Sequence, residues 1–280
     1  MEDRNKAEIL LVITAILWST SGLLIKLIDW HPLAIAGMRS IIAGTVLMLI
    51  YRKFHWRWSA SLLGGGISYA IAVIMFVTAN KLTTAANVIL IQYSAPIYIA
   101  LFSRWFLNED ITWIDWLTTG VVIWGLTLFF MDDLSISDFW GNILAMFSGI
   151  GLAWFFMFVR KIKNISTMEP IILGNLLTGV IGLPFMFQSS PDVGGWVALF
   201  IMGIFQLGLS YYLFSIAIKH VTAMEAILIP IIEPILNPIW VVLMVGEIPG
   251  KWAVVGGVIV IAAITIRGVL TNRKQVLIAK

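Results

Sequence analysis

The stretch Ala223–Trp240 reads AMEAILIPIIEPILNPIW, and the rest of the chain can be interpreted outward from it. It is apolar enough for a lipid bilayer, yet it contains two carboxylates, Glu225 and Glu233. It also contains three prolines spaced four residues apart, Pro230, Pro234 and Pro238. A proline has no N–H and clashes with the carbonyl four residues earlier, so several backbone carbonyls here lose their helical partners. In hydrocarbon such groups must bond to neighbouring helices, polar side chains or water. We therefore expect this stretch to line a polar cavity among membrane helices.

The composition of the chain is that of an integral membrane protein. Of its 280 residues, 60% are hydrophobic and only 12% are charged, and the mean hydropathy is +0.97. A soluble domain carries roughly twice that share of charge. The chain has no cysteine, which excludes a disulfide framework and a cysteine-ligated metal, and its three histidines fall in predicted loops. The net charge of +3 comes from the loops, so we expect no nucleic-acid partner.

Apolar segments of about 20 residues, each long enough to cross a hydrocarbon core of roughly 30 Å, follow one another along the chain. Short loops rich in Pro, Asp, Ser, Lys or Arg separate them. We therefore predict an all-α integral membrane protein with ten transmembrane helices, at approximately 8–28, 32–51, 61–80, 84–106, 112–131, 139–160, 168–187, 195–216, 222–245 and 250–270.

The distribution of lysine and arginine predicts the orientation of the chain. With the N-terminus inside, fourteen of these residues lie on the cytoplasmic side and only Lys26, Lys81 and Lys251 lie on the other. This is a strong positive-inside bias. The acidic segment 132–138 then falls outside. Both termini are cytoplasmic, which requires an even number of spans and agrees with ten. We expect a multi-pass protein of the cytoplasmic membrane.

An internal repeat divides the chain into two halves. Residues 32–109 and 170–247, aligned with an offset of 138, are identical at seventeen of 78 positions, and ten of these positions fall within 22 residues. The shared residues include Pro96 and Pro234. With five spans in each half, the second half enters the membrane in the opposite sense, which is the inverted-topology repeat of many secondary transporters. We assign the first five-helix repeat to 1–133, the second to 138–271 and a cytoplasmic tail to 272–280.

These features resemble the drug/metabolite transporter superfamily, and its ten-helix EamA-type branch fits best. The matching residues include the fourth-span prolines of both halves, Asn108–Glu109 and Gly246–Glu247 at the ends of the matched window, and Glu233–Pro234 in the ninth span. The resemblance implies a central cavity lined mainly by spans 1, 3, 4, 6, 8 and 9, with spans 5 and 10 as outer supports. Known members of the family export amino acids, import choline, or move sugars and nucleotide-sugars.

Glu225 is the most specific candidate for substrate binding, because the first half has an uncharged residue, Asn87, at the equivalent position. On an ideal helix, the eight residues from Glu225 to Glu233 turn through about 80°, so both carboxylates can face one cavity. A carboxylate removed from water can exchange a proton for a cationic substrate. The alternative for Glu225 is a first-turn acid favoured by the helix dipole. For Glu233, bonding to backbone groups freed by the prolines is favoured over substrate contact.

Aromatic side chains form the second part of the predicted site. They fall near the middle of spans that the resemblance places around the cavity, and aromatic faces beside a carboxylate bind ammonium groups. Packing or lipid contact is the alternative for each of them. Besides the two glutamates, the residues that we predict for substrate binding are Trp18, Tyr69, Phe76, Gln92, Tyr93, Trp154 and Tyr211.

Other charged positions within or near the spans receive structural interpretations. Arg39 lies within the second span and has Leu177 as its repeat counterpart, so an internal ion pair is favoured over substrate contact. Glu109 and Glu247 precede the fifth and tenth spans and are interpreted as caps at those turns.

The sequence therefore predicts a secondary transporter that moves a small amine or quaternary ammonium metabolite, such as choline, by alternating access, with protons as a candidate coupling ion. The alternative is an exporter of amino acids or other neutral or zwitterionic metabolites. A membrane enzyme is disfavoured, because the chain has no HExxH motif and no histidine within a span. A helical assembly module without transport is disfavoured by polar residues at matched depths in both halves. We expect no cofactor or metal, and both a monomer and a homodimer stay open.

Overall fold

The computed structural model describes residues 2–52, 58–129, 131, 139–162, 166–236 and 251–278. Within these ranges every regular element is a helix, which confirms the all-α prediction. The segments in this part of the chain that are long and apolar enough to cross a membrane are Asp3–Leu27, Pro32–Ile50, Ala60–Leu82, Phe139–Lys161, Met168–Met186 and Val193–Ala217.

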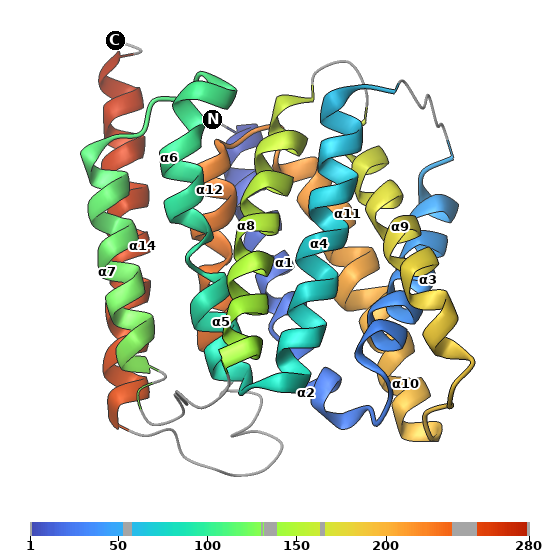
Figure 1. Ribbon diagram of the computed structural model, residues 1–280. Coiled ribbons are helices and arrows are strands. Elements are labelled where there is room, and N and C mark those ends of the chain that lie inside the picture. The colour runs from blue at the N-terminus through green and yellow to red at the C-terminus, as the bar shows by residue number, and fades with distance from the viewer. Residues whose placement is uncertain are drawn as a thin grey trace.

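The helices follow the order of the predicted segments in both halves (Figure 1). The first half contains α1 (Glu2–Trp18), α2 (Ser21–Leu27), α3 (Pro32–Ile50), α4 (Ala60–Leu82), α5 (Ala85–Gln92), α6 (Ala95–Leu107) and α7 (Trp113–Phe129). The second half contains α8 (Phe139–Lys161), α9 (Met168–Met186), α10 (Val193–Ile201), the π-helix η1 (Met202–Leu209), α11 (Ser210–Ala217), α12 (Ala223–Leu228), the 3₁₀ helix η2 (Ile229–Ile232) and α14 (Lys251–Ile278).

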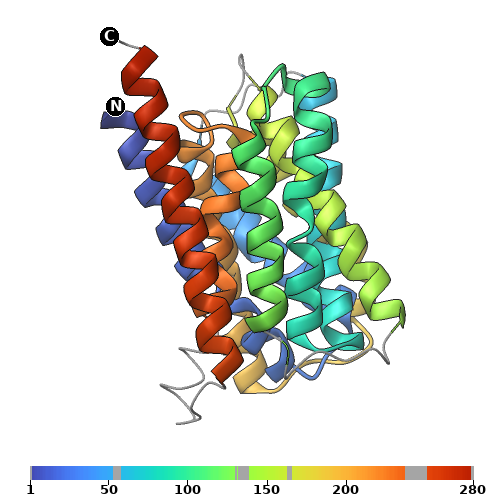
Figure 2. The same ribbon diagram turned by 90° about the vertical axis from the view of Figure 1, so that its left-hand side faces the viewer.

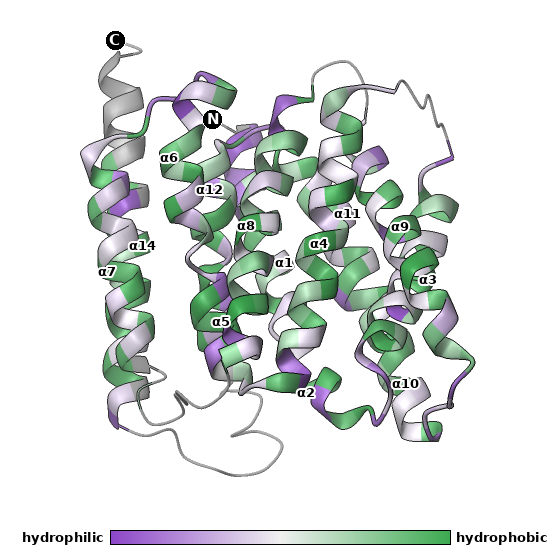
Figure 3. Cartoon of the chain, viewed as in Figure 1, coloured by the Kyte–Doolittle hydropathy of each residue, from purple (hydrophilic) through white to green (hydrophobic). Residues whose placement is uncertain are grey.

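The helices turn apolar side chains outward, as a protein surrounded by lipid must. On α4, Leu63, Ile67 and Ile71 follow one another at four-residue intervals and are exposed, while Tyr69 and Val73 on the opposite face are buried. Figure 3 shows hydrophobic residues along the sides of the bundle and hydrophilic residues mainly near the ends of the helices. This is the pattern expected when the hydrocarbon layer covers the sides and water meets the two ends.

Local signals in the sequence fix several helix starts. The His31 side chain accepts a hydrogen bond from the Leu33 N–H, and Pro32 occupies the first helical position of α3, where its missing N–H costs nothing. Ser59 and Thr84 cap α4 and α5 in the same way, each through its side-chain oxygen. These starts lie close to the predicted starts of the second, third and fourth spans, because capping depends on neighbouring residues alone.

Two of the predicted spans in the first half are interrupted. Between α1 and α2, the Ser19 and Thr20 hydroxyls donate to the carbonyls of Ile16 and Leu17 at 2.7 and 2.9 Å, which offers the backbone an alternative to helical bonds. Between α5 and α6, the interruption at 93–94 precedes Pro96, which has no N–H for the Gln92 carbonyl. Pro96, the proline of the fourth span, thus accompanies a break in the helix.

Glycines allow close contacts that hold these interrupted segments in place. A Cβ atom on Gly149 of α8 would lie 2.8 Å from the Gln92 carbonyl oxygen, so only glycine lets α8 approach the end of α5 this closely. On the opposite side of the bundle, a Cβ on Gly37 of α3 would lie 2.8 Å from the Gly182 Cα of α9. Close backbone approach through small residues is the usual basis of helix packing in membranes.

Helices α7 and α14 pack against each other at one edge of the bundle (Figures 1 and 2). A buried ion pair joins them, because Arg267 Nη2 lies 2.7 Å and its Nε 2.8 Å from Asp115 Oδ1, with both side chains less than 10% exposed. The other Asp115 oxygen accepts from the Thr112 N–H at 2.8 Å. This pair anchors α14 to the turn that begins α7.

The Arg267–Asp115 pair should contribute strongly to stability. Arg267→Gln should lower the free energy of unfolding by about 3 kcal/mol, because it leaves a buried carboxylate without its partner. Denaturant unfolding of the purified protein in detergent measures this. As a control, Arg104→Gln removes one partner of the exposed Arg104–Asp110 pair and should leave stability unchanged. Equal effects of the two substitutions would contradict the role given to Arg267.

Candidate functional site

A cavity of about 60 Å³ lies where the interrupted helices meet. It combines charged, amide and hydroxyl groups with aromatic side chains, an arrangement that binds and orients small molecules. Its polar residues are Ser21, Arg39, Gln92, Gln206 and Glu233, and its aromatic residues are Trp18, Phe76, Tyr93, Phe156 and Tyr211. These residues come from both halves of the chain.

Irregular backbone surrounds this cavity. Trp18 ends α1 at the first interruption, and Gln92 and Tyr93 lie at the interruption between α5 and α6. Gln206 belongs to η1, and Pro230 belongs to η2. Irregular helical segments of these kinds often mark functional sites, and in membranes they are tolerated where they line a cavity.

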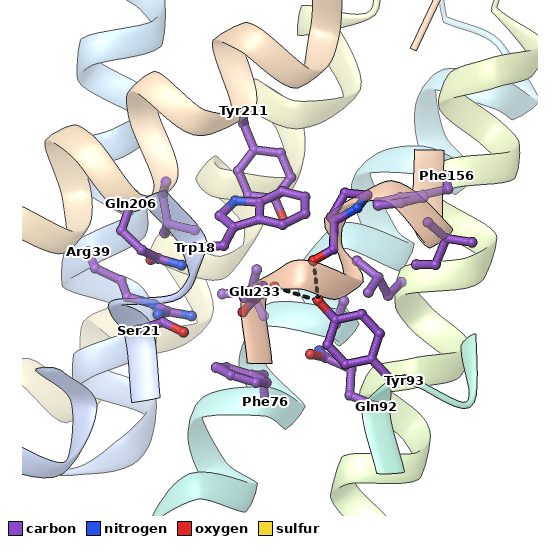
Figure 4. A pocket seen from close by; sticks show the side chains of 16 residues that line it. Trp18, Ser21, Arg39, Phe76, Gln92, Tyr93, Phe156, Gln206, Tyr211 and Glu233 are labelled. Atoms are coloured by element: carbon purple, nitrogen blue, oxygen red, sulfur yellow. Dashed lines mark hydrogen bonds between the residues drawn. The ribbon is translucent and has the colours of Figure 1, made fainter. Parts of the chain in front are cut away.

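Tyr93, Pro230 and Glu233 link the two proline-broken segments across the cavity. The Tyr93 hydroxyl lies 2.7 Å from Glu233 Oε2 and 3.1 Å from the Pro230 carbonyl oxygen (Figure 4). Pro234 has no N–H, so the Pro230 carbonyl accepts a 3₁₀-type bond from the Glu233 N–H instead, and the Tyr93 hydroxyl is its second donor. The prediction that freed carbonyls of this stretch find polar side chains is confirmed at Pro230. Glu233 itself bonds to Tyr93, although backbone bonding was favoured for it.

Aromatic rings form one wall of the cavity. The Trp18 and Tyr211 rings are 5.1 Å apart, and the Trp18 Nε1–H donates to Ser210 Oγ at 2.9 Å. Because its only polar atom is bonded outside the cavity, Trp18 presents an apolar ring face to any ligand. In Figure 4, Trp18 and Tyr211 lie above Glu233, and Phe76 lies below it.

Arg39 brings a positive charge into the same cavity. Its residue is 2% exposed, and its Nε and Nη1 atoms have no hydrogen-bond partner. The internal ion pair expected from the sequence is not found among the described residues. Gln206 Oε1 is likewise buried without a partner. The cavity is therefore lined by both Arg39 and Glu233, which do not form an ion pair with each other.

Six of the nine predicted substrate-binding residues line this cavity, namely Trp18, Phe76, Gln92, Tyr93, Tyr211 and Glu233. Tyr69 lies directly behind it, with its ring 4.9 Å from Tyr211 and its hydroxyl bonded to Asn175 at 3.2 Å. Trp154 packs away from it, against Phe102 and Phe106 at 5.4 and 5.3 Å.

Glu225 lies outside the cavity, at the first turn of α12. Its carboxylate accepts from the Thr222 N–H at 2.9 Å, while Thr222 Oγ1 accepts from the Glu225 N–H, which completes a capping box. Its other oxygen pairs with Arg4 Nη2 at 2.6 Å. The structure therefore supports the first-turn alternative for Glu225 and does not bring it together with Glu233.

Glu109 also bonds at this end of the bundle. It accepts from Arg160 Nε at 2.9 Å and from the Ala223 N–H at 3.0 Å, so it caps α12 of the other half. It was predicted to cap the turn into the fifth span, but its carboxylate caps α12 instead, and Asp115 bonds to the Thr112 N–H at the start of α7. Glu247, Gly246, the remainder of the predicted ninth span after residue 236, and the acidic segment 132–138 lie outside the described residues.

Comparison with known proteins identifies the family. The EamA-like transporter family matches residues 5–131 and 139–267. An uncharacterized transporter of Archaeoglobus fulgidus is 22% identical and covers 92% of this chain and 95% of its own. The uncharacterized transporter YdfC of Bacillus subtilis is 24% identical, and the match covers 92% of this chain and 89% of YdfC. Human solute carrier family 35 member G1 is 24% identical, and the match covers 90% of this chain and 76% of the human protein.

A solved crystal structure shares the fold. It superposes with a TM-score of 0.82 at 17% sequence identity and covers 96% of this chain and 99% of its own. Two matches to one family model, in two consecutive parts of the chain, confirm the resemblance drawn from the sequence. The chain therefore belongs to the EamA-like transporter family and is a multi-pass membrane transporter rather than an enzyme.

Proposed function

We propose that the protein is a secondary transporter of a small amine-bearing metabolite and works by alternating access. In this proposal ten transmembrane helices form two five-helix halves of inverted topology, assigned to 1–133 and 138–271, and both termini are cytoplasmic. The family matches at 5–131 and 139–267 support this division, and the ends of the described chain lie at the same end of the bundle (Figures 1 and 2).

Equivalent interruptions in the two halves support the inverted repeat. Gln92 ends α5, and Pro230, its repeat counterpart at an offset of 138, lies in η2, the irregular turn after α12. In secondary transporters, substrates bind near the midplane at such discontinuous helices, where the halves meet. Rocking of one half against the other would expose this cavity to each side of the membrane in turn.

The observation that carries the amine assignment is the position of Glu233 within aromatic walls. A carboxylate that is 9% exposed, beside Trp18 and Tyr211, offers charge and π-faces to an ammonium group. Its present partner is the neutral hydroxyl of Tyr93. An incoming cation would add a charge-assisted interaction, which is stronger than the bond to a neutral donor.

The contacts of Tyr93 also support proton exchange. Its hydroxyl has one proton but two acceptors in reach, Glu233 Oε2 at 2.7 Å and the Pro230 carbonyl at 3.1 Å. Both contacts are satisfied when Glu233 carries a proton and donates to Tyr93, while Tyr93 donates to Pro230. An arriving ammonium group then takes the place of that proton on Glu233.

Bonds at both ends of the bundle hold the cavity closed in this arrangement. At the end with the termini, Glu225 pairs with Arg4 and Glu109 pairs with Arg160. At the opposite end, Lys26 Nζ donates to the Thr83 carbonyl at 2.9 Å and a second lysine, Lys81, donates to the α2 C-cap. Opening either end requires breaking one of these sets.

Glu233 rather than Glu225 should bind the amine. A thermal-shift screen with three matched pairs tests this: phenylalanine and 2-phenylethylamine, leucine and isoamylamine, glycine betaine and choline. For the tightest of these ligands, Glu233→Gln should weaken affinity roughly ten- to hundredfold, because a charged hydrogen bond is lost. Glu225→Gln serves as the matched control and should change affinity by less than about threefold. Loss of binding in Glu225→Gln alone, or no binding by any of the six, would contradict the proposal.

Binding should release protons. In weakly buffered solution, the tightest ligand should displace about one proton per bound molecule from the wild-type protein, because one carboxylate exchanges its proton for the ammonium group. Glu233→Gln should release none. Calorimetry in two buffers of different ionisation enthalpy measures the number. Full binding by the wild-type protein without proton release would refute proton exchange at this site.

Weakening the ion pairs at the terminal end should open the cavity on that side. The chain has no cysteine, so Ile227→Cys places a single thiol in the cavity lining. Adding Glu109→Gln should raise its labelling by a membrane-impermeant reagent from the cytoplasmic face about fivefold, since about 1 kcal/mol shifts a population by that factor. Lys26→Gln, at the opposite end, should not raise it. Equal labelling with and without Glu109→Gln would show that these bonds do not close the cavity.

A further inference from the structure

Arg39 is a buried cation that forms no ion pair with the described residues. It projects from α3 into the cavity, its residue is 2% exposed, and neither Nε nor Nη1 has a hydrogen-bond partner. Glu233 is the one acidic residue among the described residues that line the cavity, and it bonds to Tyr93 and not to Arg39. The described part of the chain therefore supplies no anion to this guanidinium.

An unpaired guanidinium at this depth is costly for a membrane protein. Arginine stays protonated, and charged side chains inside membranes almost always pair with one another or with backbone carbonyls. A packed arginine that served only the fold would be paired within the protein. An unpaired guanidinium that lines a ligand cavity is explained if the ligand supplies the negative charge that pairs with it.

We propose that Arg39 is the anion-binding residue of this cavity, and that the transported molecule is a zwitterion with a carboxylate as well as an amine. This proposal rests on the amine site proposed above. The planar guanidinium matches a carboxylate through two parallel hydrogen bonds. Glu233 and Arg39 do not pair with each other, so one ligand can place its ammonium group on Glu233 and its carboxylate on Arg39.

The arrangement in the cavity agrees with such a ligand. In the view of Figure 4, Glu233 lies between Arg39 and Tyr93, with Gln206 on the same side as Arg39. A choline-like molecule has no group to offer Arg39 and would leave that charge unpaired beside a second cation. The open guanidinium of Arg39 thus favours the zwitterionic alternative among the substrate classes expected from the sequence.

The matched pairs test this proposal directly, because the members of each pair differ in the carboxylate. On the wild-type protein, the zwitterion of the best-bound pair should bind roughly ten- to hundredfold more tightly than its partner amine, the value of a charge-assisted hydrogen bond. Arg39→Gln should reduce this preference to less than about threefold. Arg39→Lys keeps the charge but not the paired donors, and should retain an intermediate preference.

The stability of the ligand-free variants separates a binding role from a structural one. If the guanidinium has no partner within the protein, Arg39→Gln removes an unpaired buried charge and should leave the melting temperature unchanged or raise it. A clear fall in the melting temperature would show that Arg39 is paired within the protein and would overturn the proposal.

The affinities of the amines and zwitterions for the wild-type protein distinguish a failure of this proposal from a failure of the amine site. Amines that bind as tightly as their zwitterions to the wild-type protein overturn the role of Arg39 and leave the amine site standing. Absence of binding by every probe overturns the amine site, and the role of Arg39 with it. This comparison uses only the wild-type protein, so it is independent of the stability measured for the Arg39 variants.

Discussion

The hydrogen bond from Tyr93 to the Pro230 carbonyl ties the architecture to the site. Prolines deprive this segment of helical hydrogen bonds, and in hydrocarbon an unsatisfied carbonyl costs several kcal/mol. The Pro230 carbonyl accepts from the Glu233 N–H in a 3₁₀ turn and also from the hydroxyl of Tyr93, at the break in the first half, at 3.1 Å. That bond draws the two broken segments together, and it brings Glu233 within 2.7 Å of the same hydroxyl. The cavity forms around this meeting point.

The same constraint explains how a binding site and a moving part can coincide. Interrupted helices have fewer internal hydrogen bonds than continuous ones, so they bend at lower cost. In this chain the interruptions lie around the cavity, while continuous helices such as α4, α8 and α9 pack closely against one another. The ligand therefore contacts the segments that must rearrange for the cavity to open. The two ends are held by different kinds of bond, ion pairs at one and lysine-to-carbonyl bonds at the other.

Local chemistry made much of the fold predictable, and failed where the backbone departs from an ideal helix. The angle expected between Glu225 and Glu233 was about 80° for an α-helix. Four residues of η2 lie between them, and 3₁₀ geometry adds about 20° at each, which widens the angle to roughly 160°. Glu225 therefore faces away from Glu233. The Thr222–Glu225 spacing of a capping box was visible in the sequence and pointed to the observed role.

Residues that depend on distant segments could not be predicted in the same way. Trp154 was predicted to bind substrate as Trp18 was, but α8 stays continuous where α1 breaks, and α8 presents Leu152 and Phe156 to the cavity. Two residues correspond to about 200° on a helix, so Trp154 points elsewhere. Arg39 carried the general signal of an intramembrane charge. That no described residue forms an ion pair with it emerges only when the helices from both halves are placed around it.

The central claim is that one ligand spans Arg39 and Glu233 at the meeting point of the broken helices. A structure of the protein bound to the tightest of the six probes tests it most directly. The ammonium group should lie against Glu233, at roughly 2.7–3.2 Å where it carries an N–H, and the carboxylate should lie at hydrogen-bonding distance from the Arg39 guanidinium. A ligand bound at Glu225, or bound in the cavity with Arg39 still unpaired, would contradict it.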